Sequence, residues 1–235
     1  NALKRDGKLI LDESDAYGVE MALQLAAANG GGDVNIVSMA PNGEMSGMRT
    51  ALAMGAAKGV LISDPALAGS DALTTAKVLA AAIQKMGSAD LIIAATESSD
   101  GYTGTVPEQM AEILGLPSVT FAKKLTINGS SLQANRQTEE GYDEVECPLP
   151  AVISVTAGVV EPRYPSFKGI MAAKSKPIDT FTASDLGVTP TGWAGAGQKI
   201  VAVTQAEARQ AGEVIEDDGT AFNKIVSFLE NLKAI

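Results

Sequence analysis

The sequence predicts an α/β fold with a doubly wound, mostly parallel sheet, an antiparallel extension and a C-terminal arm. Short apolar segments alternate with segments of helical periodicity over the first half of the chain, and the connections between them are short. This alternation is typical of parallel sheets with right-handed crossovers. After residue 118, strand patterns follow one another directly, and one amphipathic stretch closes the chain.

The parallel part is predicted element by element. Apolar residues at helical spacing indicate a first helix that is capped by Asp15 and stopped by the glycine run 30–32. Strands are expected at 33–39, 60–62 and 91–95, and helices around 45–54, 71–86 and 105–114. The unbroken apolar run at 91–95 suits a strand that is covered on both faces, as the strands of parallel sheets are.

The second half of the chain predicts the extension and the arm. Strands are expected at 118–122, 125–128, 131–136, 142–147 and 151–155, with turns at Asn128–Gly129 and Glu140–Gly141. Regular periodicity is lost from Gly187 to Gly219, and an amphipathic helix follows at 222–232. We therefore expect an α/β nucleotide-binding domain at residues 1–187 and a C-terminal arm at 188–235.

Composition excludes several functional classes. The formal net charge of −10 repels phosphate backbones and anionic lipid, so nucleic acid and membrane surfaces are poor partners. The one cysteine, Cys147, cannot form an internal disulfide, and no run approaches the roughly 20 apolar residues that span a bilayer. The chain has no histidine, which excludes internal Ser-His-Asp and Cys-His nucleophiles and His-containing zinc sites. We expect an intracellular protein without acid–base or covalent catalytic residues.

The loop from Thr96 to Thr105 is the main candidate for a ligand site. It follows the predicted strand 91–95 and precedes a predicted helix, which is where ligands bind in open α/β sheets. Its small residues allow close backbone approach, and the helix N-terminus offers N–H groups to a phosphate. Thr105 and Glu108 form a capping-box pattern. The phosphate-binding patterns G-x-x-x-x-G-K-[ST] and G-x-G-x-x-G are absent, so we expect binding without hydrolysis, with a plain connector as the alternative.

Two further segments could contribute to the same ligand site. The run Asp12, Glu13, Ser14 and Asp15 precedes the first predicted helix, where a solvated helix cap is the more common interpretation. Met39 ends a strand that faces the same crevice, and a core methionine is the ordinary explanation there.

The segment 161–177 is a candidate protein-docking surface. It gathers positive charge in an acidic chain and interleaves it with Phe167, Ile170 and Met171. Apolar side chains ringed by positive charge give both affinity and orientation to a partner. A short solvated helix after a two-proline turn is the alternative.

These segments resemble the β subunit of electron transfer flavoproteins, a family that includes the FixA-like proteins. The resemblance rests on motifs in the family's order: Arg136, Gly141, Leu149–Pro150–Ala151–Val152, Pro162–Arg163–Tyr164 and Ala173–Lys174. It extends to residues 12–25, 49–56 and 185–188, and so covers essentially the whole chain.

The resemblance implies an adenine-nucleotide α-hydrolase-like fold and a heterodimer with an α subunit that holds most of the FAD. The β subunit would bind AMP through Asp12, Glu13, Ser14, Asp15, Met39, Ala95, Thr96, Glu97, Ser98, Ser99, Asp100, Gly101, Tyr102, Thr103, Gly104, Thr105 and Val106. The docking surface for dehydrogenases would be Phe167, Lys168, Gly169, Ile170 and Met171, and Asp143 would also take part in partner interaction. The C-terminal arm would contact the α subunit.

The resemblance also implies the cellular role. In the family, electrons pass from acyl-CoA and other dehydrogenases, through the FAD, to a membrane quinone reductase, so we expect an electron carrier in the bacterial cytoplasm or the mitochondrial matrix. We expect no direct insertion into the membrane. The family's first strand has no counterpart before Asn1, and Phe167 stands where the family usually has an aliphatic residue. Two alternatives stay open: a bifurcating type with FAD in place of AMP and NADH as donor, and a nucleotide-binding module similar to stress proteins.

Overall fold

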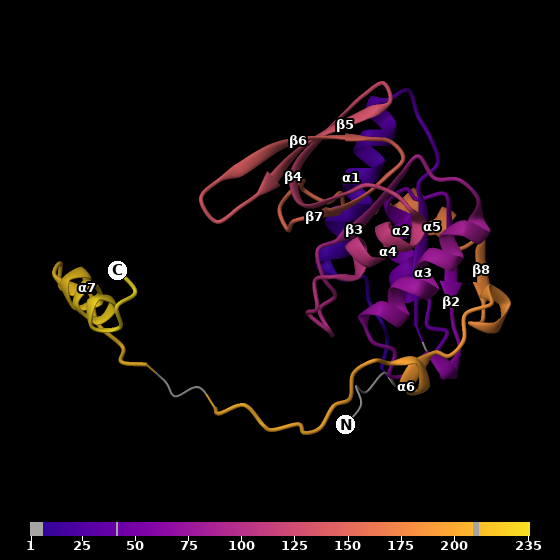
Figure 1. Ribbon diagram of the computed structural model, residues 1–235. Helices are drawn as coiled ribbons and strands as arrows, with labels where there is room; N and C mark the ends of the chain where they lie inside the picture. Colours follow the sequence, from indigo (N-terminus) through magenta and orange to yellow (C-terminus); the bar gives the residue numbers. More distant parts are fainter. Residues whose placement is uncertain (1–6, 41, 209–211) are drawn as a thin grey trace. The chain divides into compact units, whose positions relative to one another are not determined.

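The computed structural model describes residues 7–40, 42–208 and 212–235, and it confirms the α/β prediction (Figure 1). The helices are α1 (Glu13–Ala28), α2 (Ser46–Met54), α3 (Ala72–Met86), α4 (Val106–Leu114), α5 (Phe167–Ala173), α6 (Gly192–Gly195) and α7 (Ala221–Asn231). The strands are β1 (Asn35–Met39), β2 (Lys58–Ile62), β3 (Leu91–Ala95), β4 (Ser118–Asn128), β5 (Ser131–Gln137), β6 (Tyr142–Pro148), β7 (Ala151–Val155) and β8 (Ile178–Phe181).

The strands form two hydrogen-bonded sheets, ordered β1-β2-β8 and β3-β7-β4-β5-β6. The pairs β1–β2, β2–β8, β3–β7 and β4–β7 are parallel, whereas β4–β5 and β5–β6 are antiparallel. A mostly parallel core with an antiparallel extension is therefore confirmed. The extension is visible in Figure 1 as the long strands β4, β5 and β6.

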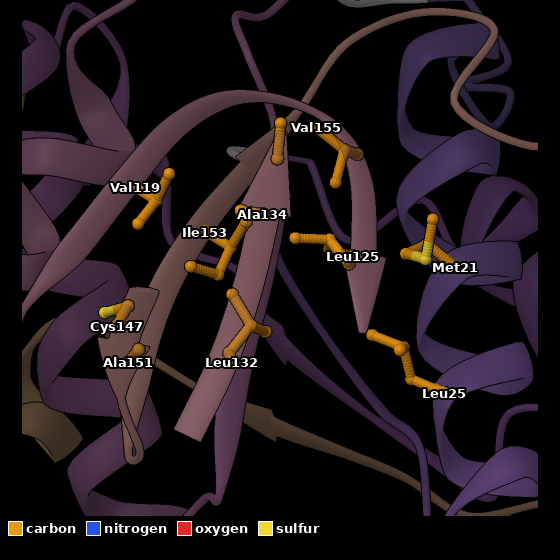
Figure 2. Packing of buried hydrophobic residues seen from close by; sticks show 11 residues of the cluster. Met21, Leu25, Val119, Leu125, Leu132, Ala134, Cys147, Ala151, Ile153 and Val155 are labelled. Carbon is orange, nitrogen blue, oxygen red and sulfur yellow. The ribbon is translucent and has the colours of Figure 1, made fainter. Parts of the chain in front are cut away.

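Helices cover both faces of the parallel strands, as a doubly wound fold requires. On β7, Ile153 packs in one cluster with Met21 and Leu25 of α1 (Figure 2). The neighbouring Val152 packs in another cluster with Met110 of α4. Successive side chains of a strand point to opposite faces, so this alternation places α1 and α4 on opposite sides of the sheet.

Strands β1 and β3 share two covering helices but are not hydrogen-bonded to each other among the described residues. On one side, Val19 of α1 packs with Ile36 of β1, and the adjacent Gly18 lies against Ile93 of β3. On the other side, Leu79 of α3 takes part in the cluster of β1 and in that of β3. Both strands are largely half-buried, whereas β7 is fully buried. The facing backbone edges of β1 and β3 therefore stay open within this part of the chain.

Three local features differ from the prediction. Helix α1 is capped by Asp12, three residues before Asp15, because the Asp12 side chain accepts from Ser14 N. The predicted strands 118–122 and 125–128 form the single strand β4, whose register shifts between Val119 and Ala122. Strand β8 was not predicted, because its four residues alternate weakly and pair only with a strand more than 100 positions earlier.

The C-terminal residues form a second compact unit. Contacts divide the chain into Asn1–Lys199 and Ile200–Ile235, and α7 lies in the second unit. Helix α7 exposes Phe222, Ile225 and Phe228 on its surface, and the residue that follows it, Leu232, is exposed as well. An apolar face left open in this way suits a helix that packs on another protein. The predicted boundary at residues 187 and 188 stays a prediction.

The structure contains no helix in its described part with the length and apolar character that a membrane crossing requires.

Candidate functional site

The predicted ligand loop follows β3 directly and is tied to the end of β7. Thr96 Oγ1 donates to the carbonyl oxygen of Val155 at 3.1 Å, and Tyr102 N donates to Ser98 O at 3.0 Å. Tyr102 and Gly104 both have positive φ, at 48° and 62°. For tyrosine this conformation is unfavourable, and such strain is often found at binding sites. The loop is thus held in a defined conformation at the carboxyl end of the parallel strands β3 and β7.

The N-terminus of α1 meets this loop. Asp12 Oδ1 accepts from Ser14 N at 2.9 Å, which caps the helix. The Ser99 hydroxyl hydrogen-bonds the same carboxylate and, with the contacts from Ser14, holds the pKa of Asp12 below its ordinary value. Asp12 and Ser99 are 87 positions apart in the sequence, so the fold brings two separately predicted parts of the ligand site into contact.

Asp15 lies one turn further along α1 and has an unusual titration. Its side chain keeps an open side toward solvent. Desolvation by the surrounding protein and repulsion from Asp12 nevertheless raise the pKa of Asp15 to about 6. An acidic group in this state is neutral or anionic near physiological pH, so it can donate to or accept from a ligand.

The start of α4 differs from the predicted capping box. Thr105 precedes α4, but its side chain makes no cap hydrogen bond to the helix backbone; its Oγ1 accepts instead from Gln109 Nε2 at 3.4 Å. The capping-box prediction was wrong here because the backbone of Thr105 is not extended, with φ −126° and ψ −5°. Two buried oxygens in the first turns of α4, Glu108 Oε2 and Gln109 Oε1, lack a hydrogen-bond partner in the structure. Acceptors of this kind suit hydroxyl or amino donors of a ligand.

Met39 packs into the core. Its side chain joins the cluster of Val60, Ile62 and Val78 between β1, β2 and α3. This packing matches the ordinary interpretation of a methionine at this position.

The predicted docking residues lie on α5, which packs against α2. Phe167 is 80% exposed, and Ile170 and Met171 are about half exposed. A Cβ on Gly169 would lie within van der Waals overlap of Ala53 O on α2, so the two helices approach closely at this glycine. Helix α5 therefore packs closely on α2 with one face and exposes apolar side chains to solvent.

Asp143 lies elsewhere in the fold. It is on β6, the last strand of the five-stranded sheet, and pairs with Arg136 on β5 at 3.7 Å. Both side chains are exposed, so this pair contributes little stability. The structure places Asp143 on a different element from α5, and the two predicted parts of the docking surface come from separate regions of the chain.

Comparison with known proteins decides the family. A family model described as electron transfer flavoprotein domain matches residues 1–186. The electron transfer flavoprotein subunit beta of Mycobacterium tuberculosis (strain ATCC 25618 / H37Rv) is 42% identical over 232 residues, which is 96% of this chain and 87% of the relative. The chain belongs to the electron transfer flavoprotein β-subunit family.

More distant relatives agree with this assignment. The electron transfer flavoprotein subunit beta of Thermoanaerobacterium thermosaccharolyticum is 36% identical over 208 residues, covering 87% of this chain and 79% of the relative. The caffeyl-CoA reductase-Etf complex subunit CarD of Acetobacterium woodii is 33% identical over 222 residues, covering 94% of this chain and 84% of the relative.

Three long-range polar contacts near the predicted docking helix were not predicted from the sequence. Glu20 is 3% exposed on α1 and binds Arg163, whereas Arg49 and Lys176 link α2 to α5. The only available signal for Glu20 was a carboxylate next to Val19 on the apolar side of the predicted helix. Its partner is 143 residues away, so no local pattern could identify the pair.

Proposed function

We propose that the chain is the β subunit of a heterodimeric electron transfer flavoprotein, binding AMP and helping to enclose an FAD that the α subunit holds. The heterodimer would pass electrons from acyl-CoA and other dehydrogenases to a quinone reductase. The observation that supports this most is the contact of Asp12 with Ser99 at the carboxyl edge of the sheet. That contact joins the N-terminus of α1 to the small-residue loop after β3, and a helix N-terminus beside such a loop is a common place for a nucleotide to bind.

The polar groups at the site fit an adenine nucleotide. The loop before α4 offers small residues and the helix N-terminus, which suit the phosphate. The first turn of α1 carries Glu13 and Asp15, which would repel phosphate and suit the ribose hydroxyls. The unpartnered oxygens of Glu108 and Gln109 suit hydroxyl or amino donors as well. We therefore expect the phosphate on the α4 side and the sugar on the α1 side.

The role of this chain in electron transfer is one of binding and presentation. The FAD supplies the redox chemistry when it is bound. This chain's residues would hold AMP, wall the flavin pocket and present α5 to a dehydrogenase through Phe167, Ile170 and Met171. The exposed apolar face of α7 would pack on the α subunit.

Extraction of bound nucleotide from the co-purified heterodimer tests this proposal. Acid release followed by chromatography is expected to yield AMP in addition to FAD. A second FAD without AMP would support the bifurcating alternative, and the absence of any adenylate beyond the α-subunit FAD would contradict AMP binding.

A matched pair of glycine variants tests the location of the site. Gly104 and Gly129 have nearly the same positive φ, 62° and 60°, so valine is strained to a similar degree at both positions. Gly104 lies in the ligand loop beside Glu97, whereas Gly129 lies in the β4–β5 turn with open space around it. Gly104→Val is expected to lose AMP and retain FAD, and Gly129→Val to retain both. Equal AMP content in the two variants would contradict the assigned loop.

A further inference from the structure

Arg163 anchors an irregular segment to the core of the protein. Residues 156–166 connect β7 to α5 without helix or strand. From this segment, Arg163 Nε donates to Glu20 Oε2 at 2.6 Å, Arg163 Nη2 donates to Glu20 Oε1 at 2.9 Å, and Arg163 N donates to Glu20 Oε2 at 3.2 Å. Side chain and backbone of one residue are thus fixed by a single carboxylate in the bidentate geometry that arginine favours.

The surroundings of Glu20 favour this contact. It lies on α1 and is 3% exposed, and Gln24 Nε2 donates to its Oε1 at 2.8 Å. Burial alone would raise the pKa of Glu20, but the hydrogen bonds from Arg163 and Gln24 outweigh burial and hold this pKa below its ordinary value. The carboxylate therefore stays charged and fully hydrogen-bonded, which is the condition under which a buried ion pair is tolerated.

The anchored segment leads directly into the proposed docking helix. Arg163 is four residues before Phe167, and Ser166 caps α5 by accepting from Gly169 N at 3.0 Å. Tyr164, between them, is 92% exposed. The position of these exposed side chains thus depends on where Arg163 holds the backbone.

The opposite end of α5 is fixed separately. Arg49 Nη1 donates to Ala173 O and to Lys176 O, each at 2.7 Å. Lys176 Nζ donates to Leu52 O at 2.9 Å and to Ala56 O at 2.6 Å. These contacts hold the C-terminal end of α5 on α2. The Glu20–Arg163 pair instead fixes the segment that leads into the N-terminal end of α5.

We infer that Glu20 and Arg163 are positioning residues for the docking surface, fixing the segment that carries Tyr164 and Phe167 so that a dehydrogenase meets it already ordered. This inference rests on the proposed docking role of α5. Binding to an ordered surface avoids the loss of conformational freedom that a mobile segment would suffer on association. Glu20 is buried on α1, so it acts on a partner through Arg163 and not by contact.

Steady-state electron transfer from a purified acyl-CoA dehydrogenase to the heterodimer tests the inference. In Glu20→Gln, the KM for the flavoprotein is expected to rise about tenfold, with turnover at saturation unchanged, because only the ordering of the docking segment is lost. Arg163→Lys is expected to give a similar rise. The effects of the two changes should not add in the double variant, because they break the same contact.

The matched controls separate positioning from general damage. Glu112→Gln removes an exposed carboxylate on α4 and should leave KM unchanged. FAD and AMP content should match the wild type in every variant. Hydrogen exchange should become faster in residues 160–166 of Glu20→Gln and stay unchanged in β7. If Glu20→Gln does not fold, Glu20→Met/Arg163→Met replaces the pair by apolar groups of similar size and is measured in the same way.

Phe167→Ala distinguishes the failure of this inference from the failure of the docking proposal. If Phe167→Ala raises KM and the folded Glu20 variants do not, the positioning role is wrong. If Phe167→Ala leaves KM unchanged, the docking role of α5 is wrong, and the inference falls with it.

Discussion

The Arg49 guanidinium donates to the carbonyl oxygen of Lys176 at 2.7 Å, while the Lys176 ammonium donates to two carbonyl oxygens near the end of the helix that carries Arg49. Arg49 of α2 thus binds carbonyl groups at and just after the C-terminal end of α5, and Lys176, three residues after α5, binds carbonyl groups near the C-terminal end of α2. Carbonyl groups at a helix C-terminus have no partner within the helix, and a cation there is favourable. Arg49 and Lys176 are 127 positions apart in the sequence, and they join the same two helices that approach closely at Gly169.

Removal of one cation should loosen α5. Arg49→Met is expected to cost about 2 kcal/mol of unfolding free energy, because hydrogen bonds to charged groups are worth about 1.5–3 kcal/mol each in favourable cases. Urea unfolding measures the change. Arg136→Met, which removes an exposed pair at 3.7 Å, should cost less than about 1 kcal/mol and serves as control. Equal losses in the two variants would contradict the special role of Arg49.

Close approach of α5 and α2 predicts a steric effect at Gly169. A Cβ there would overlap Ala53 O, a backbone atom that cannot move independently of α2. Gly169→Ala is therefore expected to destabilise the protein by about 1–3 kcal/mol. Gly141→Ala, at a glycine with nothing within 4 Å of the added atom, should be near neutral in the same thermal melt. A neutral Gly169→Ala would show that the helices are further apart than described.

Local patterns predicted the elements better than the contacts between them. The apolar run 91–95 identified β3, and the small residues after it identified the loop that meets Asp12. The exact residue at which a helix begins was predicted less reliably, since Asp12 rather than Asp15 caps α1. Both aspartates are ordinary cap residues, and only the backbone geometry selects between them.

Long-range partners could not be predicted from local patterns. The local sequence around Glu20 does not indicate which residue pairs with its carboxylate, and Arg163 makes its burial possible. Strand β8 exists because β2 offers it a parallel edge, and the register shift in β4 is linked to the bond from Phe121 N to the buried Ser154 Oγ at 3.1 Å. Tertiary contacts of this kind override local propensity.

The titration of Asp15 predicts a pH dependence of stability. Its folded pKa of about 6 lies above the ordinary aspartate value of 3.8, so the folded state binds the proton more tightly than the unfolded state. Stability from this group is fully present below about pH 4 and is lost as pH rises through about 6. Asp15→Asn should therefore be more stable than wild type by about 1 kcal/mol at pH 7.5, after discounting for the open side of the group, and the difference should vanish near pH 4.

Urea unfolding at several pH values measures this dependence. A difference between Asp15→Asn and wild type that stays constant from pH 4 to 7.5 would contradict the raised pKa.

The open edges of β1 and β3 predict an alternating pattern of hydrogen exchange. In a parallel strand, successive backbone N–H groups point to opposite neighbours, so a strand with one open edge protects every second amide. Alternate amides of β1 and β3 should exchange at least about tenfold faster than their neighbours, whereas β7, paired on both sides, should be protected throughout. Uniform protection along β1 and β3 in the 235-residue chain would show that another segment pairs with these edges.

Native mass spectrometry of the co-expressed heterodimer tests the central claim most directly. The account predicts a mass equal to the two chains plus one FAD and one AMP, with the AMP lost in Gly104→Val and retained in Gly129→Val. A heterodimer that carries FAD but no AMP, or whose AMP is unaffected by Gly104→Val, would contradict the assignment of the nucleotide to the loop that contacts Asp12.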